Sequence, residues 1–245
     1  MVGEMSIPYK IPGRVQTRAA ATAPSAYAVF DCETTGTTPG LDEIVSLAVV
    51  RLDADGVETG RLSHLVRPSR PIPSAATAVH GLSDKDVAAA PRFVEIAAEL
   101  LEVLVGAVFV AHNARFDLAM LQHAFLSAGI EYRPVAVACT LNAFRLLEPL
   151  APDHRLESLC QRRGIPLVDA HDAPSDVSAT AALLRVLLDE GIAPETIQLD
   201  HEAFMRLRSR GDTRPATAAQ IRRVFALGYA AGLSRDGILE LVARA

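Results

Sequence analysis

The feature that most constrains the fold is a change from paired strand patterns to alternating strands and helices. The strand patterns cover residues 27–31, 44–52, 57–66, 107–111 and 135–138. Asp55-Gly56, between the second and third patterns, is typical of a tight hairpin turn. From Pro91 onward the remaining strand patterns alternate with helical ones. Hairpin strands followed by this alternation predict an α/β fold, with a mixed five-stranded sheet flanked by helices.

The helical patterns define the rest of the domain organisation. Before Pro194 they cover residues 91–104, 114–128, 140–147, 156–163 and 174–189. After Pro194 the pattern is purely helical. We therefore expect a flexible arm over residues 1–25, an α/β domain over 26–192, a linker over 193–214 and a small helical accessory module over 215–245.

Composition argues against several classes of protein. Half of the residues are hydrophobic, but the apolar runs are shorter than a membrane helix requires, so we expect a cytoplasmic protein with no membrane role. The three cysteines have no paired spacing, which argues against a disulfide framework and a zinc site. The net charge of −5 combines an acidic body with a mildly basic stretch over residues 200–245. That stretch suits either a solvated helical face or a nucleic-acid contact.

Two carboxylates follow the first strand pattern, in the stretch Asp31-Cys-Glu33-Thr34-Thr35-Gly36. Residues i and i+2 of an extended chain point to the same face, so Asp31 and Glu33 would project together. Taken alone, this pair is typical of a solvated strand end. A divalent cation such as Mg²⁺ or Mn²⁺ would relieve their repulsion, because carboxylate oxygens are ligands that these ions prefer.

Two further stretches place carboxylates where helices begin. Asp117 falls in the first turn of the helix after the strand pattern 107–111, and Asp176 in the first turn of the helix over 174–189. A helix N-terminus stabilises such a carboxylate, so each has an ordinary explanation. Sites of α/β sheets lie at strand ends, however, which would bring these residues into one crevice with Asp31. Four carboxylates there require bound cations, and two divalent ions together can act on a phosphodiester.

Taken together, the three stretches resemble the motifs of the DEDDh branch of the DnaQ-like 3′→5′ exonucleases. That family includes the proofreading subunit of bacterial replicative polymerase and RNase T. The matching stretches are Asp31-Cys-Glu33-Thr-Thr-Gly, His112-Asn113-Ala-Arg-Phe116-Asp117 and His171-Asp-Ala-Pro-Ser-Asp176. Val79-His80-Gly81-Leu82-Ser83 is also similar to a stretch common in the proofreading type. The resemblance covers about residues 26–190 and implies an RNase H-like exonuclease fold.

The resemblance also implies a reaction and a division of roles. We expect hydrolysis of the 3′-terminal phosphodiester of single-stranded DNA, releasing nucleoside 5′-monophosphates in proofreading or repair. Asp31, Glu33, Asp117 and Asp176 are expected to bind two divalent metal ions, Mg²⁺ or Mn²⁺, with Asp31 bridging them. His171 is expected to act as general base toward the attacking water, because its intrinsic pKa lies near working pH.

A second set of residues is expected to contact the 3′ end of the substrate: Thr34, Thr35, Gly36, His80, Asn113 and Phe116. Three of them have equally ordinary explanations, His80 as a loop histidine, Asn113 as a helix N-cap and Phe116 as a core residue. Aromatic residues make up 5% of the chain, so platforms for base stacking must be few.

The sequence leaves two other functions open. One is a 3′→5′ exoribonuclease acting on RNA ends or short oligoribonucleotides, since no residue can be assigned to reading the 2′-OH. The other is an inactive nucleic-acid-binding or adaptor module, against which the complete set of carboxylates and the histidine argue. The helices expected over 215–245 are candidates for contact with a DNA polymerase or another replication or repair protein.

Overall fold

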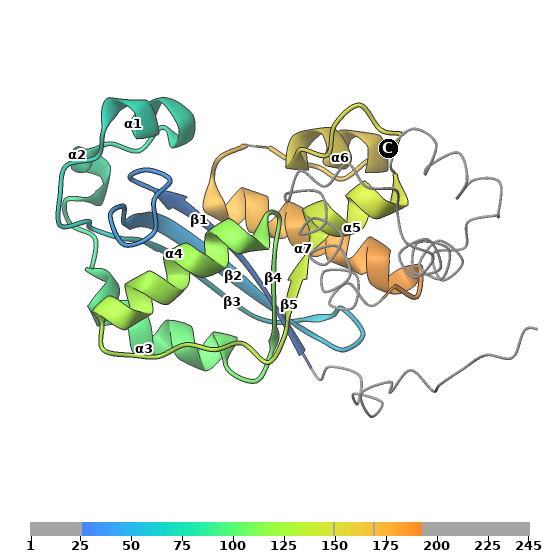
Figure 1. The fold of residues 1–245 in the computed structure, drawn as a ribbon, viewed down its shortest axis with the longest axis horizontal. Coiled ribbons are helices and arrows are strands. Elements are labelled where there is room, and N and C mark those ends of the chain that lie inside the picture. Colours follow the sequence, from blue (N-terminus) through green and yellow to red (C-terminus); the bar gives the residue numbers. More distant parts are fainter. Residues whose placement is uncertain (1–25, 149, 169, 193–245) are drawn as a thin grey trace, which may run out of the picture.

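The computed structural model describes residues 26–148, 150–168 and 170–192 (Figure 1). The predicted N-terminal arm, linker and C-terminal helical module fall in residues 1–25 and 193–245, outside the described residues. The described residues form one five-stranded sheet with helices on both faces, which confirms the predicted mixed α/β architecture. None of their helices is long and apolar enough to cross a bilayer.

The sheet has the strand order β3-β2-β1-β4-β5. Its strands are β1 (Ala26–Thr34), β2 (Ile44–Asp53), β3 (Glu58–Leu65), β4 (Val108–Ala111) and β5 (Val137–Cys139). β2 is antiparallel to both of its neighbours, whereas β4 is parallel to β1 and to β5. β1, β3, β4 and β5 therefore run in the same direction and end at the same edge of the sheet.

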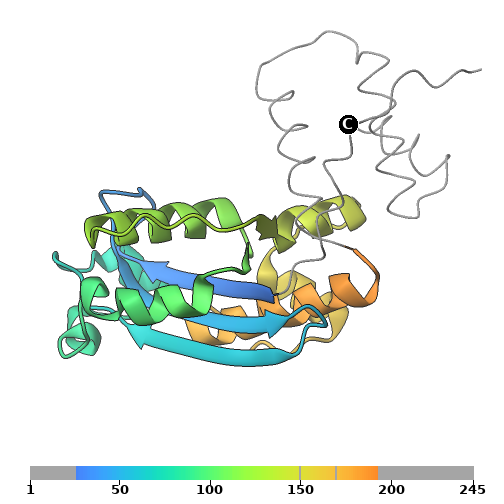
Figure 2. The same ribbon diagram turned by 90° about the horizontal axis from the view of Figure 1, so that it is seen from below.

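The helices form a layer on each face of the sheet. They are α1 (Ser74–His80), α2 (Asp84–Val87), α3 (Phe93–Leu104), α4 (Ala114–Ser127), α5 (Thr140–Leu147), α6 (Leu156–Arg163) and α7 (Ala173–Asp189). Figure 2 shows α4 and α7 on opposite sides of the sheet. Each face of the sheet has its own apolar core, one beneath α3 and α4 and one beneath α7.

β1 is the central strand, and its side chains alternate between these two cores. Phe30 and Cys32 belong to the core beneath α3 and α4, and Val29 to the core beneath α7. The same alternation directs Asp31 and Glu33 toward α7. The middle residue of the Asp-Cys-Glu stretch thus faces a different helix from the two carboxylates that flank it.

β1 is longer than the sequence pattern predicted. The strand was expected to end at Asp31, but its pairing with β2 continues to Thr34, with Glu33 opposite Ser46. Polar residues extend a strand when a partner strand satisfies their backbone hydrogen bonds. β5 begins later than expected, at Val137, where its pairing with β4 starts.

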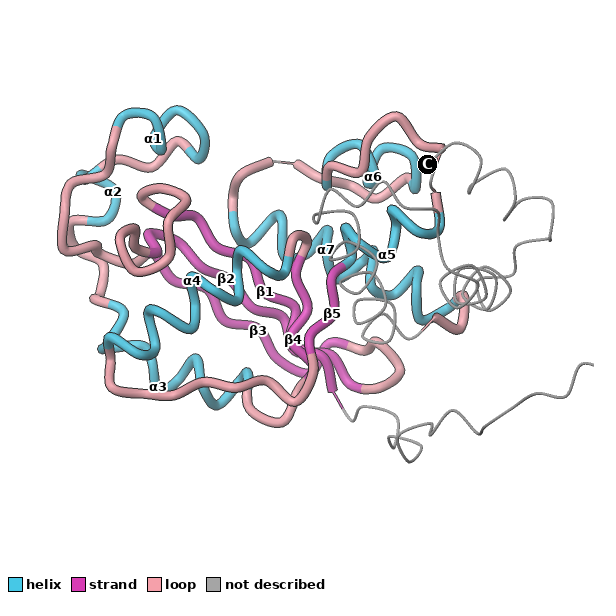
Figure 3. The backbone as a smooth tube through the Cα atoms, viewed as in Figure 1, coloured by secondary structure: helices cyan, strands magenta, loops and turns pink. Residues whose placement is uncertain are grey.

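The connections that surround the end of β1 come from distant parts of the chain. Figure 3 shows the turn after β1, the segment that carries α1 and α2, and the connection that leads into α7 along this side of the sheet. A small core of Val45, Ile72 and Val87 holds the α1–α2 segment in place. The second motif stretch follows β4, which ends at the same edge as β1. All three predicted motif stretches therefore lie at one edge of the sheet.

Candidate active site

Three polar side chains from three segments of the chain meet at this edge. Glu33 comes from β1, His171 from the connection before α7, and Asp176 from the first turn of α7. Each can place one ligand atom within 4.8 Å of the others, a spacing that could hold a metal ion. Asp31 precedes Glu33 by two residues on the same face of β1, and the charges of Asp176 and Glu33 add to burial in raising its pKa.

The start of α7 leaves one oxygen of Asp176 free. Asp172 caps the helix by accepting a hydrogen bond from the Ser175 backbone N–H at 3.1 Å. His171 has a left-handed φ of 65°, which is uncommon for a residue other than glycine, and its backbone N–H donates to Asp176 Oδ2 at 3.1 Å. Asp176 Oδ1 is buried and has no hydrogen-bond partner among the described residues. A buried oxygen of this kind is stabilised by a donor or a cation.

Asp117 reaches the site from the other face of the sheet. It lies in the first turn of α4 and is only 4% exposed. The Cys32 thiol donates to Asp117 Oδ1 across a sulfur–oxygen distance of 3.6 Å. Burial raises the pKa of Asp117 to about 7 despite this contact. After burial, the charge of Asp117 is the next cause that raises the pKa of Asp31, although the two carboxylates come from different elements.

Among the described residues, no lysine or arginine forms an ion pair with these carboxyl groups, and His171 is the positive neighbour of Asp176. Burial first, and then the charges of Asp117, Asp176 and Glu33, raise the pKa of Asp31 well above its usual value. Burial, followed by the charge of Asp176, raises the pKa of Glu33 to about 8, and burial also raises the pKa of Asp176. A divalent cation would neutralise such a group, and carboxylate oxygens suit Mg²⁺ and Mn²⁺. The donor set therefore fits these ions.

The turn after β1 is closed by side chains that point inward. Thr34 Oγ1 donates to the Gly36 carbonyl at 2.6 Å, and Thr35 Oγ1 donates to Asp42 Oδ1 at 3.3 Å. Both threonines are buried. A Cβ added at Gly36 would come within 2.5 Å of the Asp42 carboxylate, so a larger residue cannot fit without movement. Any ligand resting on residues 34–36 would thus meet mainly their backbone.

His80 is the last residue of α1, and the structure places it near His171. Its Nδ1 accepts a hydrogen bond from the Leu82 backbone N–H at 3.1 Å, whereas its Nε2 is buried without a hydrogen-bond partner among the described residues. Burial lowers the pKa of His80, the nearby Thr34 backbone opposes this shift, and the charge of His171 adds to it. An unpaired ring nitrogen beside the site can serve as a hydrogen-bonding group for a ligand.

The other two predicted substrate contacts differ from each other. Asn113 occupies the N-cap position of α4, but its side chain makes no capping hydrogen bond, and the residue is exposed with a left-handed φ of 96°. Phe116 is half-buried and packs against the core beneath α3 and α4. Asn113 is therefore available to a ligand, while Phe116 contributes to the core with part of its surface.

The sequence of the chain also matches a known protein family. The model of the RNase_T family, described as "Exonuclease", matches residues 28–184, more than half of the chain and all three motif stretches. The chain belongs to this exonuclease family. Members of the family are nuclease hydrolases, and the five-stranded sheet seen here is their RNase H-like exonuclease fold.

Two curated relatives of this exonuclease chain are longer proteins. The "DNA polymerase III subunit epsilon-like protein" of Rhodobacter capsulatus is 42% identical over 167 residues, covering 66% of the chain and 23% of the relative. The "3'-5' exonuclease DinG" of Staphylococcus haemolyticus is 34% identical over 160 residues, covering 65% of the chain and 18% of the relative. The chain therefore matches only about a fifth of each relative's length.

A solved structure matches over nearly its whole length. Exonuclease X, in complex with 5′ overhanging duplex DNA, has a TM-score of 0.57 and 29% sequence identity to this exonuclease chain. The match covers 70% of this chain and 96% of exonuclease X. This similarity extends the family relationship from the sequence to the three-dimensional fold.

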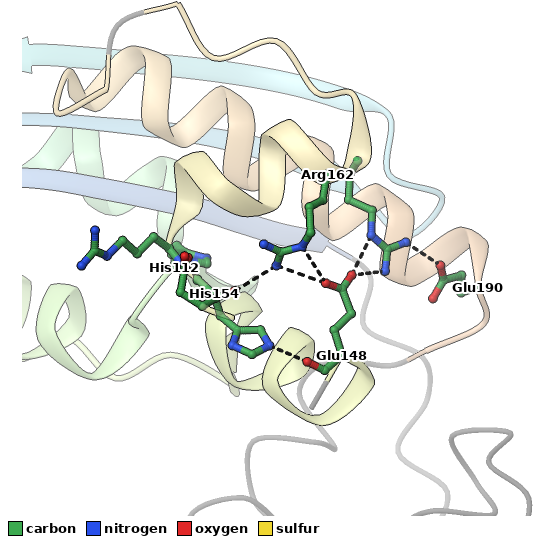
Figure 4. Close-up of polar contacts among 8 residues, drawn as sticks. His112, Glu148, His154, Arg162 and Glu190 are labelled. Atoms are coloured by element: carbon green, nitrogen blue, oxygen red, sulfur yellow. Dashed lines mark hydrogen bonds and ion pairs between the residues drawn. The ribbon is translucent and has the colours of Figure 1, made fainter. Parts of the chain in front are cut away.

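His112 is a residue of the second exonuclease motif to which the sequence assigned no role. Its Nε2 donates to the His154 carbonyl and its Nδ1 accepts from the Thr140 hydroxyl, both at 2.9 Å. Burial lowers the pKa of His112 to about 4, so the ring is neutral. Figure 4 shows His112 next to His154, whose own ring donates to the Glu148 carbonyl at 2.8 Å. His112 thereby fixes the connection between α5 and α6 to the end of β4.

The sequence analysis also did not predict the contributions of two other residues to the site. Cys32 contacts Asp117, and Asp172 adds a fifth negative charge that raises the pKa of both Asp31 and Glu33. The N-cap position of Asp172 beside His171 was a usable signal, because it places that carboxylate next to the third motif. Nothing in the local pattern indicates the Cys32 contact, which joins residues 85 positions apart.

Proposed function

We propose that this chain is a two-metal-ion 3′→5′ exonuclease that removes nucleoside 5′-monophosphates from the 3′ end of single-stranded DNA. The observation that carries the proposal is the group of carboxylates from β1, α4 and α7, whose pKa values are raised by burial and, for Asp31 and Glu33, by the charges of their neighbours. The chain's exonuclease family and the names of its two relatives, one of them epsilon-like, support a role in proofreading or repair.

The carboxylates divide between two cation positions in this proposal. Asp31, Glu33 and Asp176 would hold one divalent ion, and Asp31 and Asp117 the other, with Mg²⁺ or Mn²⁺ as the ion. The free Asp176 Oδ1 and the 4.8 Å spacing of its group support the first position. When bound, such ions supply neutralising charge to the carboxylates and stabilise negative charge on a phosphodiester.

His171 would take the proton of the attacking water at a ring nitrogen. Its side chain is exposed and lies with Glu33 and Asp176 in the same group, which favours a mobile proton acceptor over a buried structural histidine. The left-handed backbone of His171 is held by its N–H bond to Asp176. Backbone conformations of this kind concentrate at functional sites.

The 3′-terminal nucleotide would rest on the turn after β1. Thr34, Thr35 and Gly36 would present backbone groups to it, because both threonine side chains are already engaged within the turn. The unpaired His80 Nε2 and the exposed Asn113 would supply polar contacts from either side. Phe116 would contact the sugar or base with the part of its ring that the core leaves exposed.

The test is release of mononucleotides from a 3′-labelled single strand in the presence of Mg²⁺ or Mn²⁺. His171→Gln should lower the turnover number by roughly 10²–10⁴-fold, the usual contribution of a general base, while metal binding changes little. His64→Gln, at a histidine on the edge strand β3, is the matched control. Wild-type protein that releases no mononucleotide, or release that survives His171→Gln, contradicts the proposal. An RNA strand of the same sequence decides between DNA and RNA.

A further inference from the structure

Three exposed arginines have no side-chain hydrogen bond or ion pair within the part of the chain that the structure describes. They are Arg115 in α4, Arg145 in α5 and Arg155 at the N-cap of α6, and we call them the arginine group. Their neighbours Arg162 and Arg163 differ, because both form ion pairs with Glu148. A free guanidinium keeps five donors and a full positive charge available for an anion.

The arginine group gathers around His112. Arg115 follows His112 by three residues, in the first turn of α4. Arg155 follows His154, whose carbonyl accepts the His112 hydrogen bond at 2.9 Å. Burial is the main cause of the low pKa of His112, the hydrogen bond to the His154 carbonyl opposes it, and the charge of Arg145 is close enough to lower the pKa further. Three separate segments thus bring positive charge to one place.

The surrounding contacts fix the connection that carries Arg155. His154 donates to the Glu148 carbonyl, and the Glu148 carboxylate pairs with Arg162 at 3.1 Å (Figure 4). The ring of His112 joins this assembly to the end of β4. The network satisfies Arg162 and Arg163 internally and leaves the arginine group facing solvent. The connection that carries Arg155 is therefore held in position by part-buried contacts.

Arg115 connects the arginine group to the candidate active site along the chain. Arg115 and Asp117 share the first turn of α4, where Asp117 is buried and Arg115 is exposed. The site itself is rich in carboxylates, which repel the phosphates of a nucleic acid beyond those next to the bound cations. Attraction for the rest of the strand must come from positive charge nearby, and arginine binds phosphate through paired hydrogen bonds.

We propose that the arginine group binds backbone phosphates of the nucleic-acid strand upstream of its 3′-terminal nucleotide. This inference rests on the proposed function, because that function places the 3′ end at the carboxylates. It adds a direction to the substrate path: the strand leaves the site along the first turn of α4 toward the connection between α5 and α6. Sequence-independent phosphate contacts of this kind set affinity and position rather than base preference.

The test compares two substrates that differ in the number of phosphates. One is a single strand of about 20 nucleotides, and the other is the p-nitrophenyl ester of thymidine 5′-monophosphate, which has one phosphodiester and nothing upstream. In the Arg115→Gln, Arg145→Gln, Arg155→Gln triple variant, the ratio of kcat/KM for the strand to that for the ester should fall about tenfold. The slope of log kcat/KM for the strand against log salt should become less negative by roughly 2.

Arg133→Gln is the matched control. Arg133 is exposed, forms an ion pair with Glu131 and precedes β5 at the opposite edge of the sheet, and its substitution removes one of the three charges that the triple variant loses. A triple variant that keeps the wild-type ratio and salt slope, or changes them no more than Arg133→Gln does, overturns the inference. An equal loss on strand and ester overturns it too, because the group would then act on the chemistry or the fold.

Failure of the proposed function can be told apart from failure of this inference. Fluorescence anisotropy of a labelled strand in EDTA measures binding without turnover. If wild-type protein hydrolyses neither substrate but the triple variant binds the strand more weakly and with a smaller salt slope, the proposed function fails and the phosphate contacts stand. If wild-type and triple variant bind equally, the inference fails whatever the catalytic result.

Discussion

The two faces of β1 hold buried negative charge in different ways. On the α7 face, Asp31, Glu33 and Asp176 lie close together, and one oxygen of Asp176 has no partner among the described residues. On the α4 face, Asp117 is alone, more deeply buried, and accepts a hydrogen bond from the Cys32 thiol. After burial, the charges on both faces raise the pKa of Asp31.

The difference indicates two degrees of dependence on a cation. Like charges on the α7 face can be stabilised only by an ion or by protonation, so that group should respond strongly to metal. Asp117 has local donors from Cys32 and from the helix N-terminus, which hold its orientation before any ion binds. The three predictions that follow test this contrast, from the largest expected effect to the smallest.

Removing the charge that both faces share should have the largest effect. Asp31→Asn should lower turnover by roughly 10³-fold, since several kcal/mol of transition-state charge stabilisation would depend on the bridging carboxylate. The same change should raise the melting temperature of the metal-free protein, because it removes mutual repulsion. Nucleotide release and calorimetry measure the two quantities. Asp55→Asn, in the exposed hairpin turn, should change neither. A lower melting temperature for metal-free Asp31→Asn would contradict the claim that neighbouring carboxylates repel Asp31.

Weakening the α4 face alone should have an intermediate effect. Cys32→Val fills nearly the same volume but removes the donor to Asp117, and loss of such supporting contacts typically weakens metal affinity about 10–100-fold. Isothermal titration with Mn²⁺ measures the affinity. Cys32→Thr restores a donor and should recover part of it. Cys139→Val, at a buried strand cysteine of the same core, is the control. Equal Mn²⁺ affinity in Cys32→Val and Cys139→Val would remove any role for the thiol.

A change of pH should act on both faces at once and without mutation. Folding raises the pKa of Glu33 from 4.5 to about 8 and that of Asp117 from 3.8 to about 7. Their protonated forms are thus favoured in the folded state, so their contribution to stability is complete below the unfolded pKa values and is lost as pH rises through the folded ones. Urea denaturation in EDTA should show the free energy of unfolding falling between about pH 4 and pH 8.

Two additions sharpen the pH experiment. Glu33→Gln should flatten the pH dependence, because the substituted side chain does not titrate. Saturating Mn²⁺ should also flatten it in the wild-type protein, because a bound cation favours the ionised carboxylates. Stability of the metal-free protein that rises with pH over this range would show that the carboxylates have favourable partners.

Much of the fold could be predicted from local pattern. The helices Thr140–Leu147 and Leu156–Arg163 have the predicted bounds, because apolar spacing and the helix-ending Gly164 are local signals. The extension of β1 to Thr34 was not predicted, since it depends on pairing with β2. Pairing between strands overrides the low strand preference of Asp and Glu.

The residues of the candidate site also divide into those that local motifs predict and those that depend on contacts between distant segments. The carboxylates and His171 could be named from motif order, and the structure brings Glu33, His171 and Asp176 together while linking Asp31 to Asp117 through charge. The roles of Cys32 and His112 depend on contacts with Asp117 and His154, 85 and 42 residues away in the chain. No local pattern encodes such contacts, because they arise only when distant elements pack.

The place of Asp31 and Glu33 in the central strand determines which part of the candidate site opens first when the protein begins to unfold. Backbone amides of a central buried strand exchange with solvent mainly when the whole domain opens, whereas connections open locally at much lower free energy. Asp31 and Glu33 are paired with β2, but His171 lies on the connection before α7. Local opening would therefore displace the histidine while the two carboxylates keep their relative position. Under the proposed function, mild denaturant should abolish proton transfer by His171 first, and cation binding by the carboxylates of β1 should persist until cooperative unfolding.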